Sequence, residues 1–329
     1  MVIRASSSTG IFSRRSSPAI VPRNLFTSFT LSKYARSSML FCTGVSNFSN
    51  FFIIQNYHFN GLYCIMCHMK AKKSLGQHFL KSRGVVRTMV REAGIVPGDT
   101  VLEAGPGKGV LTEVLLSAGA KVIAVEKDET LAEFLKEKFA SEIAEGRLVL
   151  SAGDILGEHA KFGLPNSQYK IVANIPYYIT GEFLRKFLSS ENQPESMTLL
   201  VQKEVAERIV ARDGKESILS MSVKAYGIPR YIQTVKAREF SPPPKIDSAI
   251  LHISDISKEF FYGVVKNEEK FFALVRAGFA HKRKFFIRNL EMVADKDSIA
   301  EAFAVCGIHE KTRAEELALA SWKCLYQRL

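Results

Sequence analysis

Short apolar segments alternate with amphipathic segments from about residue 84 onward, and this alternation restricts the chain to few folds. Four apolar segments have the length and composition of buried strands: residues 99–105, 121–128, 147–154 and 169–174. Three segments around them have apolar residues at helical spacing: residues 84–95, 109–119 and 129–140. Strands that alternate with helices form a parallel sheet covered by helices on both faces. The sequence therefore predicts an α/β fold, with later strands at 197–202 and 248–254.

The strand pattern stops after about residue 254. Residues 269–290 and 298–308 have helical patterns instead. We therefore predict an α/β domain at residues 69–254 and a small all-helical domain at residues 255–329. The sequence has no run of about 18 or more uncharged apolar residues, so we expect no membrane span.

Residues 1–68 hold six basic residues and no acidic one, which accounts for half of the net charge of +12. This leader has three interpretations: a transit peptide rich in Arg and Ser, an upstream extension that is not normally translated, or, least expected, an ordered domain. The extension is slightly favoured, because residues 59–69 are aromatic and contain Cys. We expect a cytoplasmic protein if translation starts at Met69, and a mitochondrial or plastid protein if the leader is a transit peptide.

Two features of the cysteines need an interpretation. Cys64, Cys67 and His68 have the spacing of a c-type haem attachment signature, which we interpret as chance spacing in an unstructured leader. Cys306 and Cys324 lie in the globular part of the chain. We expect both to be reduced and to pack as small core residues.

A glycine-rich loop follows the first predicted strand. Gly105, Gly107 and Gly109 lie between that strand and the next helix, and Glu103 precedes them. Glycines let the backbone approach a ligand and leave the helix N-terminus facing it. Glu126 ends the next strand, where an acid suits the hydroxyls of a ribose. By itself the loop is also compatible with packing alone.

Three acidic residues end successive predicted strands: Glu103, Glu126 and Asp154. Ligands of such sheets lie outside the carboxyl ends of the strands. Three acids disfavour a pyrophosphate and favour a ligand with hydroxyls, amines and a positive centre. The pattern E-x-G-x-G-x-G with these acids resembles the class I S-adenosylmethionine-dependent methyltransferases, which have a Rossmann-like sheet. The resemblance implies that the loop passes the methionine part, that Glu126 holds the ribose and that Asp154 accepts from the adenine amine.

The fourth predicted strand ends in Asn174-Ile-Pro176-Tyr177. This motif resembles the N-[ILP]-P-[YF] signature of methyltransferases that act on exocyclic amino groups of bases. The resemblance implies that Asn174 accepts hydrogens from the amine. Pro176 would shape the backbone, and Tyr177 and Phe240 would be two walls for the base. The alternative is an Asn-capped turn with core aromatics.

Four segments narrow the resemblance: KKSLGQHFL (72–80), NIPYYIT (174–180), FSPPPKIDSAI (240–250) and GFAHKRKFFIRNL (278–290). Together they resemble the small-subunit ribosomal RNA adenine dimethyltransferases, the KsgA/Dim1 family. The resemblance implies N6,N6-dimethylation of two adjacent adenosines in the 3'-terminal hairpin loop of small-subunit rRNA, with the immature small subunit as partner. It also implies that His78 and Leu80 close over the cofactor, although the family often has Asn in place of His78. We expect a monomer and no metal.

Five cations are candidates for RNA binding: Arg276, Lys282, Arg283, Lys284 and Arg288. They fall in one predicted helix, where basic residues alternate with Phe. The alternative is a solvated helix face.

Two other functions stay open. One is a methyltransferase of large-subunit rRNA of the macrolide-resistance type, and the other is a non-catalytic organellar transcription factor of the same fold. The segments around His78 and Lys282 favour the small-subunit enzyme. Intact Glu126, Asp154 and Asn174 argue against a loss of catalysis.

Overall fold

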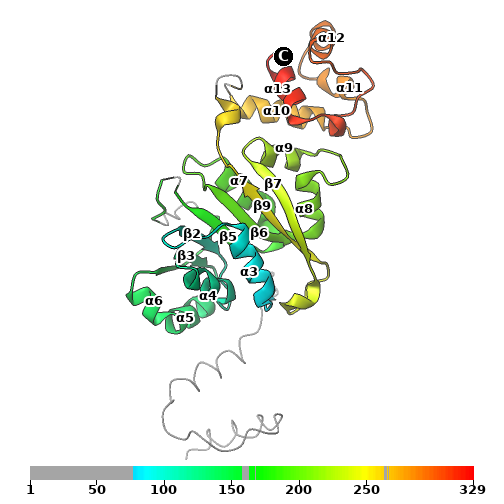
Figure 1. Cartoon of the computed structure of the whole chain (residues 1–329). Coiled ribbons are helices and arrows are strands. Elements are labelled where there is room, and N and C mark those ends of the chain that lie inside the picture. Colours follow the sequence, from blue (N-terminus) through cyan, green and yellow to red (C-terminus); the bar gives the residue numbers. More distant parts are fainter. Residues whose placement is uncertain (1–76, 158–162, 167, 263–264, 266) are drawn as a thin grey trace, which may run out of the picture. The chain divides into compact units, whose positions relative to one another are not determined.

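A seven-stranded sheet is the centre of the chain in the computed structural model, which describes residues 77–157, 163–166, 168–262, 265 and 267–329. The strand order is β4-β3-β2-β5-β6-β9-β7 (Figure 1). The strands are β2 (Thr100–Ala104), β3 (Lys121–Glu126), β4 (Leu148–Ala152), β5 (Lys170–Asn174), β6 (Ser196–Gln202), β7 (Ile228–Val235) and β9 (Ser248–Ser254). Neighbours from β4 to β6 pair in parallel, and β9 pairs antiparallel with β6 and β7. The predicted parallel α/β sheet is confirmed, with an antiparallel edge.

Alternating side chains of the strands enter two separate hydrophobic cores, one on each face of the sheet. In β5, Val172 belongs to one core and Ile171 and Ala173 to the other. The helices α3 (Arg83–Glu92), α4 (Val110–Ser117) and α5 (Glu129–Lys138) contribute to the first core. The helices α7 (Thr180–Leu188), α8 (Lys203–Val210) and α9 (Ile218–Lys224) contribute to the second. Both faces of the central strands are therefore buried, as a parallel sheet requires.

The start of α4 shows why the loop needs a glycine next to the sheet. Gly109 is the N-cap residue of α4 and has a φ of 77°. A Cβ atom at this position would lie 2.6 Å from the ring of Phe139. A side chain at Gly109 would therefore strain the backbone and overlap the core at the same time.

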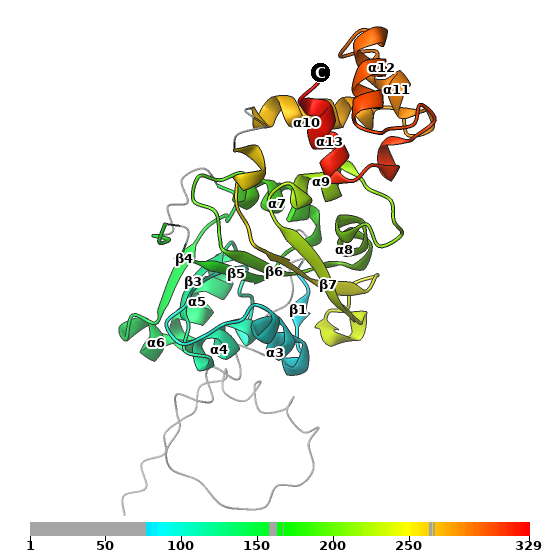
Figure 2. The same cartoon turned by 45° about the horizontal axis from the view of Figure 1, so that its top comes forward.

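Four α-helices follow the last strand: α10 (Glu268–Gly278), α11 (Phe286–Leu290), α12 (Lys296–Val305) and α13 (Leu319–Tyr326) (Figure 2). The expectation of one helix over 269–290 is wrong, because the chain turns between α10 and α11. Asn289 Nδ2 donates to the Gly278 carbonyl at 2.6 Å and so satisfies the end of α10. A Cβ atom at Gly278 would overlap the rings of Phe286 and Trp322, so the turn folds Phe286 back onto Gly278.

Two residue pairs link the end of β9 and the following helices to neighbouring elements. The Tyr226 hydroxyl donates to Glu268 at the start of α10, and Lys258 pairs with Glu191 at 2.5 Å. We propose the boundary between the two predicted domains after Ser254, where the last strand ends. Among the described residues, no helix is both long enough and apolar enough to cross a membrane.

Several helices and strands were not predicted from the sequence. Helix α7 was not predicted, although Phe183, Leu184 and Phe187 have helical spacing. Helices α9 and α13 and strand β7 were also missed. A further sheet of two short strands, β1 (Phe79–Leu80) and β8 (Phe240–Ser241), joins segments far apart in sequence. No local pattern marks that pairing.

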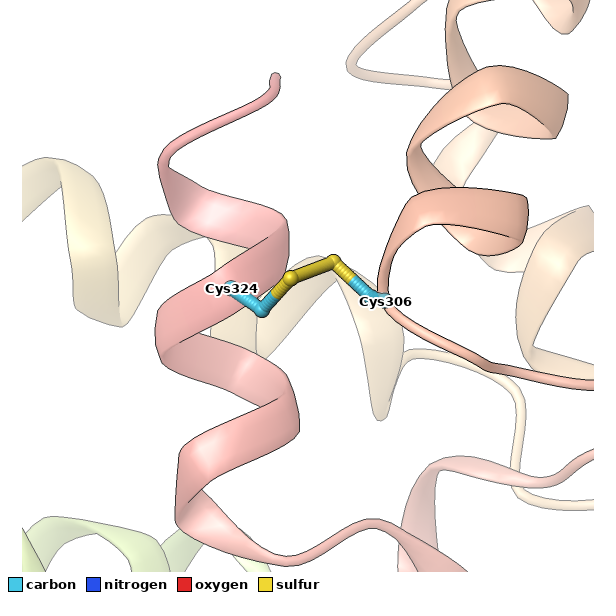
Figure 3. Close-up of a disulfide and its surroundings, with 2 residues drawn as sticks. All are labelled: Cys306 and Cys324. Carbon is cyan, nitrogen blue, oxygen red and sulfur yellow. A yellow bond between two sulfur atoms is a disulfide. The ribbon is translucent and has the colours of Figure 1, made fainter.

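Cys306 and Cys324 form a disulfide between the end of α12 and α13 (Figure 3). Their Cα atoms lie 5.9 Å apart, and both residues are half-buried. The expectation of two reduced core thiols is therefore wrong. The chain reverses through the 3-10 turn Ala314–Glu316 and brings α13 against the end of α12, which spacing in the sequence does not reveal. The predictions for residues 1–68, with Cys64 and Cys67, lie outside the described residues.

Candidate active site

A cavity lies at the carboxyl ends of the central strands, and every predicted catalytic and cofactor residue except Phe240 lines it. These residues are His78, Leu80, Glu103, Gly105, Gly107, Glu126, Asp154, Asn174, Pro176 and Tyr177. They come from β1, from the ends of β2, β3 and β5, and from the loop after β4. Parallel strands bring their carboxyl ends to one edge of the sheet, which explains why distant residues meet here.

The Glu126 carboxylate is held by the backbone on both oxygens. The Gly107 amide donates to Oε2 at 3.0 Å, and the Asp128 amide donates to Oε1 at 2.9 Å. Burial raises the pKa of Glu126, while these two hydrogen bonds oppose the rise. Gly107 has a φ of 60°, which places its amide toward Glu126 at little conformational cost. The side chain is therefore fixed, with lone pairs remaining for a ligand.

Glu103 is the most buried acid of the site, with 1 % of its surface exposed. Burial raises its pKa to about 8, and the nearby Glu126 adds to the rise. The Thr112 hydroxyl donates to Oε2 at 2.7 Å and partly opposes it. Burial therefore favours the protonated form of Glu103.

Asp154 differs from the other two acids because 41 % of its side chain is exposed. Lys127 Nζ lies 2.7 Å from its Oδ2, and the Leu156 amide donates to its Oδ1 at 2.9 Å. The hydrogen bond from Lys127, followed by that from Leu156, holds the pKa of Asp154 below its ordinary value. The three acids thus have different protonation equilibria within one cavity.

The Asn174 motif follows β5 directly. Asn174 Nδ2 donates to the backbone carbonyl of His78 at 3.2 Å. The hydroxyls of Tyr177 and Ser248 are 2.6 Å apart, and burial raises the pKa of Tyr177. No side-chain hydrogen bond caps the N-terminus of the 3-10 turn Tyr177–Ile179. The Asn174 amide donates to His78, next to β1, and does not cap the turn.

The structure does not bring Phe240 together with Tyr177. Phe240 is opposite Leu80 in the β1–β8 ladder, and only 1 % of its surface is exposed. Its side chain packs in a hydrophobic core with Leu80 and does not line the cavity. The expectation that Phe240 is an open second wall for a base is therefore wrong for this conformation. The His78 ring lies beside Tyr177 instead, with ring centroids 6.1 Å apart and an angle of 23° between the planes.

The whole described part of the chain matches one known family. The family model described as ribosomal RNA adenine dimethylase matches residues 68–329. The chain belongs to the ribosomal RNA adenine dimethylase family.

Among curated relatives, this dimethylase is similar to the "Ribosomal RNA small subunit methyltransferase A" of Dehalococcoides mccartyi. The two are 42 % identical over 264 residues, which cover 78 % of this chain and 88 % of the relative. Two solved structures are also similar, each at 25 % identity. For a dimethyladenosine transferase from Plasmodium falciparum the TM-score is 0.65, and the match covers 75 % of this chain and 96 % of the transferase. For the 23S rRNA methyltransferase ErmE the TM-score is 0.64, and the match covers 76 % of this chain and 99 % of ErmE.

A second cavity of this dimethylase is lined by residues of α7, α8, α9, α10 and the turn after α10. Three of the five predicted RNA-binding cations line it: Arg276, Lys282 and Lys284. Arg283 and Arg288 do not, and Arg288 pairs with Glu291 at 2.8 Å. All five are exposed. The predicted cluster is therefore divided between this cavity and the surrounding surface.

Other cations of the second cavity were not predicted from the sequence. Arg185 of α7 lines it, and so do Arg208 of α8 and Arg212, which follows that helix. Arg208 pairs with Glu204 at 2.7 Å, and Arg212 pairs with Glu207 at 3.1 Å. Among the described residues no ion pair involves Arg185, Arg276, Lys282 or Lys284. Only the position of α7, which sequence reasoning did not find, could have indicated Arg185.

Proposed function

We propose that this protein transfers methyl groups from S-adenosylmethionine to the N6 amines of two adjacent adenosines in the 3'-terminal hairpin loop of small-subunit rRNA. One observation carries the proposal: Asn174 and Tyr177 share a cavity with Glu126 and the glycine loop. A base amine and a nucleoside cofactor can therefore meet there. Membership of the dimethylase family and the name of the curated relative support the reaction and the small-subunit substrate.

The residues of the cavity fit the cofactor chemically. The backbone-held Glu126 can accept hydrogen bonds from both ribose hydroxyls. Asp154 can accept from the adenine amine, with Lys127 adjusting its position. Gly105 and Gly107 leave room for the methionine part beside the backbone. When bound, the cofactor supplies an activated methyl group on a sulfonium, so the protein contributes mainly proximity and orientation.

Asn174 would orient the nucleophile. Its Nδ2 already donates to the His78 carbonyl, which leaves Oδ1 to accept from the adenine N6 amine. Accepting hydrogens of the amine moves the nitrogen toward tetrahedral geometry and makes its lone pair available. Tyr177 offers a face on which the base stacks, with a stabilisation of about 1–3 kcal/mol. Pro176, with a φ of -57°, holds the turn between the two residues.

The exposed cations of α10, of α11 and of the turn between these helices would hold the rRNA. Arg276, Lys282 and Lys284 line the second cavity, and Arg283 and Arg288 lie on the surface outside it. Lys and Arg bind phosphates largely without regard to sequence. They would therefore contribute affinity, while the cavity around Asn174 selects the base.

The proposal is tested by transfer of radiolabelled methyl groups to unmethylated small subunits, with large subunits in parallel. We expect label in small-subunit adenosines, and its loss in the Asn174→Ala variant. Label only in large-subunit RNA would identify an enzyme of the ErmE type instead. No label on either subunit, with cofactor binding intact, would contradict the enzymatic function.

A further inference from the structure

The two-stranded β1–β8 sheet lies directly beside the catalytic motif. Phe79 pairs with Ser241, and Leu80 pairs with Phe240. The Lys81 amide donates to the Glu239 carbonyl at 2.8 Å and extends the pairing on one side. On the other side the link is made by a side chain: His78 Nδ1 lies 2.8 Å from the Pro242 carbonyl oxygen. The His78 imidazole therefore fixes the end of β1 that is nearest to the cavity.

The same end of β1 holds the Asn174 amide. The His78 carbonyl accepts from Asn174 Nδ2 at 3.2 Å. A carbonyl oxygen only accepts, so this bond determines which way the amide points. The opposite orientation would direct NH₂ toward the cavity and present donors to an amine that also donates. Among the hydrogen bonds of the described residues none occupies Oδ1 of Asn174, and this half-buried residue lines the cavity.

We propose that His78 is a positioning residue: its imidazole, bound to the Pro242 carbonyl, holds its own backbone carbonyl where it orients Asn174. This inference rests on the proposed role of Asn174 toward the adenine amine. Because the Pro242 carbonyl only accepts, His78 Nδ1 is the donor of this hydrogen bond.

The chemistry of the link predicts which side chains can replace His78. The δ-nitrogen of Asn is attached to Cγ, as Nδ1 of His is, so His78→Asn keeps a donor at the same distance along the side chain. The amide nitrogen of Gln lies one bond further out, and Ala has no donor. His78→Asn should retain the orientation of Asn174, whereas His78→Gln and His78→Ala should lose it.

The test measures methyl transfer to small subunits by the full chain and its three His78 variants, together with cofactor affinity by calorimetry. We expect kcat to fall about tenfold in His78→Ala and His78→Gln, because a misplaced reacting group slows the reaction without removing it. His78→Asn should keep kcat within about threefold of the wild type. Because His78 also lines the cavity predicted to hold the cofactor, every kcat is measured at saturating cofactor, and calorimetry reports any change in Kd separately. Thermal melting shows whether each variant is folded, and the Gln variant serves if the Ala variant is not.

A double-mutant cycle tests whether His78 acts through Asn174. In an Asn174→Ala background, His78→Ala should cause little further loss, because there is no amide left to orient. Full and independent losses would overturn the inference, as would an unaffected kcat with a weakened cofactor Kd. A wild type that does not methylate small subunits would overturn the proposed function and this inference with it. An active wild type with an equally active His78→Ala variant would overturn this inference alone.

Discussion

The cavity at the strand ends and the cationic surface formed by α10, α11 and the turn between them hold their titratable groups in opposite ways. Glu103 and Glu126 are almost completely buried, and each carboxyl has hydrogen bonds from named neighbours. Arg276, Lys282 and Lys284 are exposed, and no described acid pairs with them. Burial and hydrogen bonds fix the orientation of the carboxyl groups, but burial costs desolvation free energy. The exposed cations keep their charge and the freedom of their side chains to move.

The difference corresponds to two separate tasks. Methyl transfer depends on the angle and distance between two reacting groups, so preorganised and buried polar groups are effective there. Binding a phosphate backbone depends on charge, and mobile cations can adapt to it. Substitutions in the first region should therefore change rates and cofactor affinity steeply, and substitutions in the second should cause small and salt-dependent changes.

The largest effect is expected for Asn174→Ala. Removing the acceptor should lower kcat for methyl transfer by at least about a hundredfold, comparable to the loss of one preorganised hydrogen-bond partner in other active sites. Cofactor Kd should change much less. Steady-state assays with saturating cofactor and rRNA substrate give kcat, and calorimetry gives Kd. A small change in kcat would show that Asn174 does not orient the nucleophile.

A smaller effect, on cofactor affinity, is expected for Glu126→Gln. The neutral side chain keeps its volume but loses the charge that strengthens hydrogen bonds to the ribose, which contribute roughly 1.5–3 kcal/mol each. Cofactor Kd should rise by about ten- to a hundredfold, as measured by calorimetry. Glu113→Gln is a matched control, because Glu113 pairs with Lys138 outside the cavity. An equal rise of cofactor Kd in Glu113→Gln would contradict the proposed binding of the ribose by Glu126.

Glu103 should make stability depend on pH. Its pKa is about 8 in the folded protein, above the ordinary value of 4.5. The folded state therefore holds the proton more tightly, so the free energy of unfolding should fall as pH rises from about 4.5 to about 8. We expect a decrease of several kcal/mol, about 1.4 kcal/mol for each pH unit of that range, measured by denaturant unfolding at several pH values. Glu103→Gln keeps an acceptor for Thr112 and should remove this dependence of the free energy of unfolding on pH. An unchanged dependence would show that another group causes it.

The smallest effects are expected on the cationic surface. Lys282→Ala and Lys284→Ala should each weaken rRNA binding by roughly two- to fivefold near physiological salt. Each should also reduce the slope of log K against log salt by about 0.7–0.9, the value for one lost phosphate contact. Arg288→Ala is the control, because Glu291 already pairs with Arg288. Equal slopes for all three variants would show that ion pairing does not determine which cations meet RNA.

The same contrast explains what the sequence could predict. Residues at the ends of parallel strands must meet, so Glu103, Glu126, Asp154 and Asn174 could be placed in one cavity from local patterns alone. The position of His78 could not be foreseen, because it depends on the pairing of β1 with β8, which are far apart in sequence.

The direction of side chains and the packing between distant helices could not be predicted from the sequence either. The helix expected over 269–290 ends at Gly278, and the rings of Phe286 and Trp322 pack where a Cβ atom of that residue would lie. Helical spacing alone does not reveal such packing. Likewise, the sequence could not tell Arg276, which lines the second cavity, from Arg288, which pairs with Glu291.

The disulfide between Cys306 and Cys324 closes a covalent loop between α12 and α13, in the same C-terminal helical segment as these cations (Figure 3). Dissolved salt screens exposed charges but has no effect on a covalent bond. Ionic strength can therefore change how strongly the cationic surface attracts a polyanion without loosening the link between α12 and α13. Attraction and mechanical integrity are controlled by different variables in this part of the molecule, the first by ions and the second by thiol reductants.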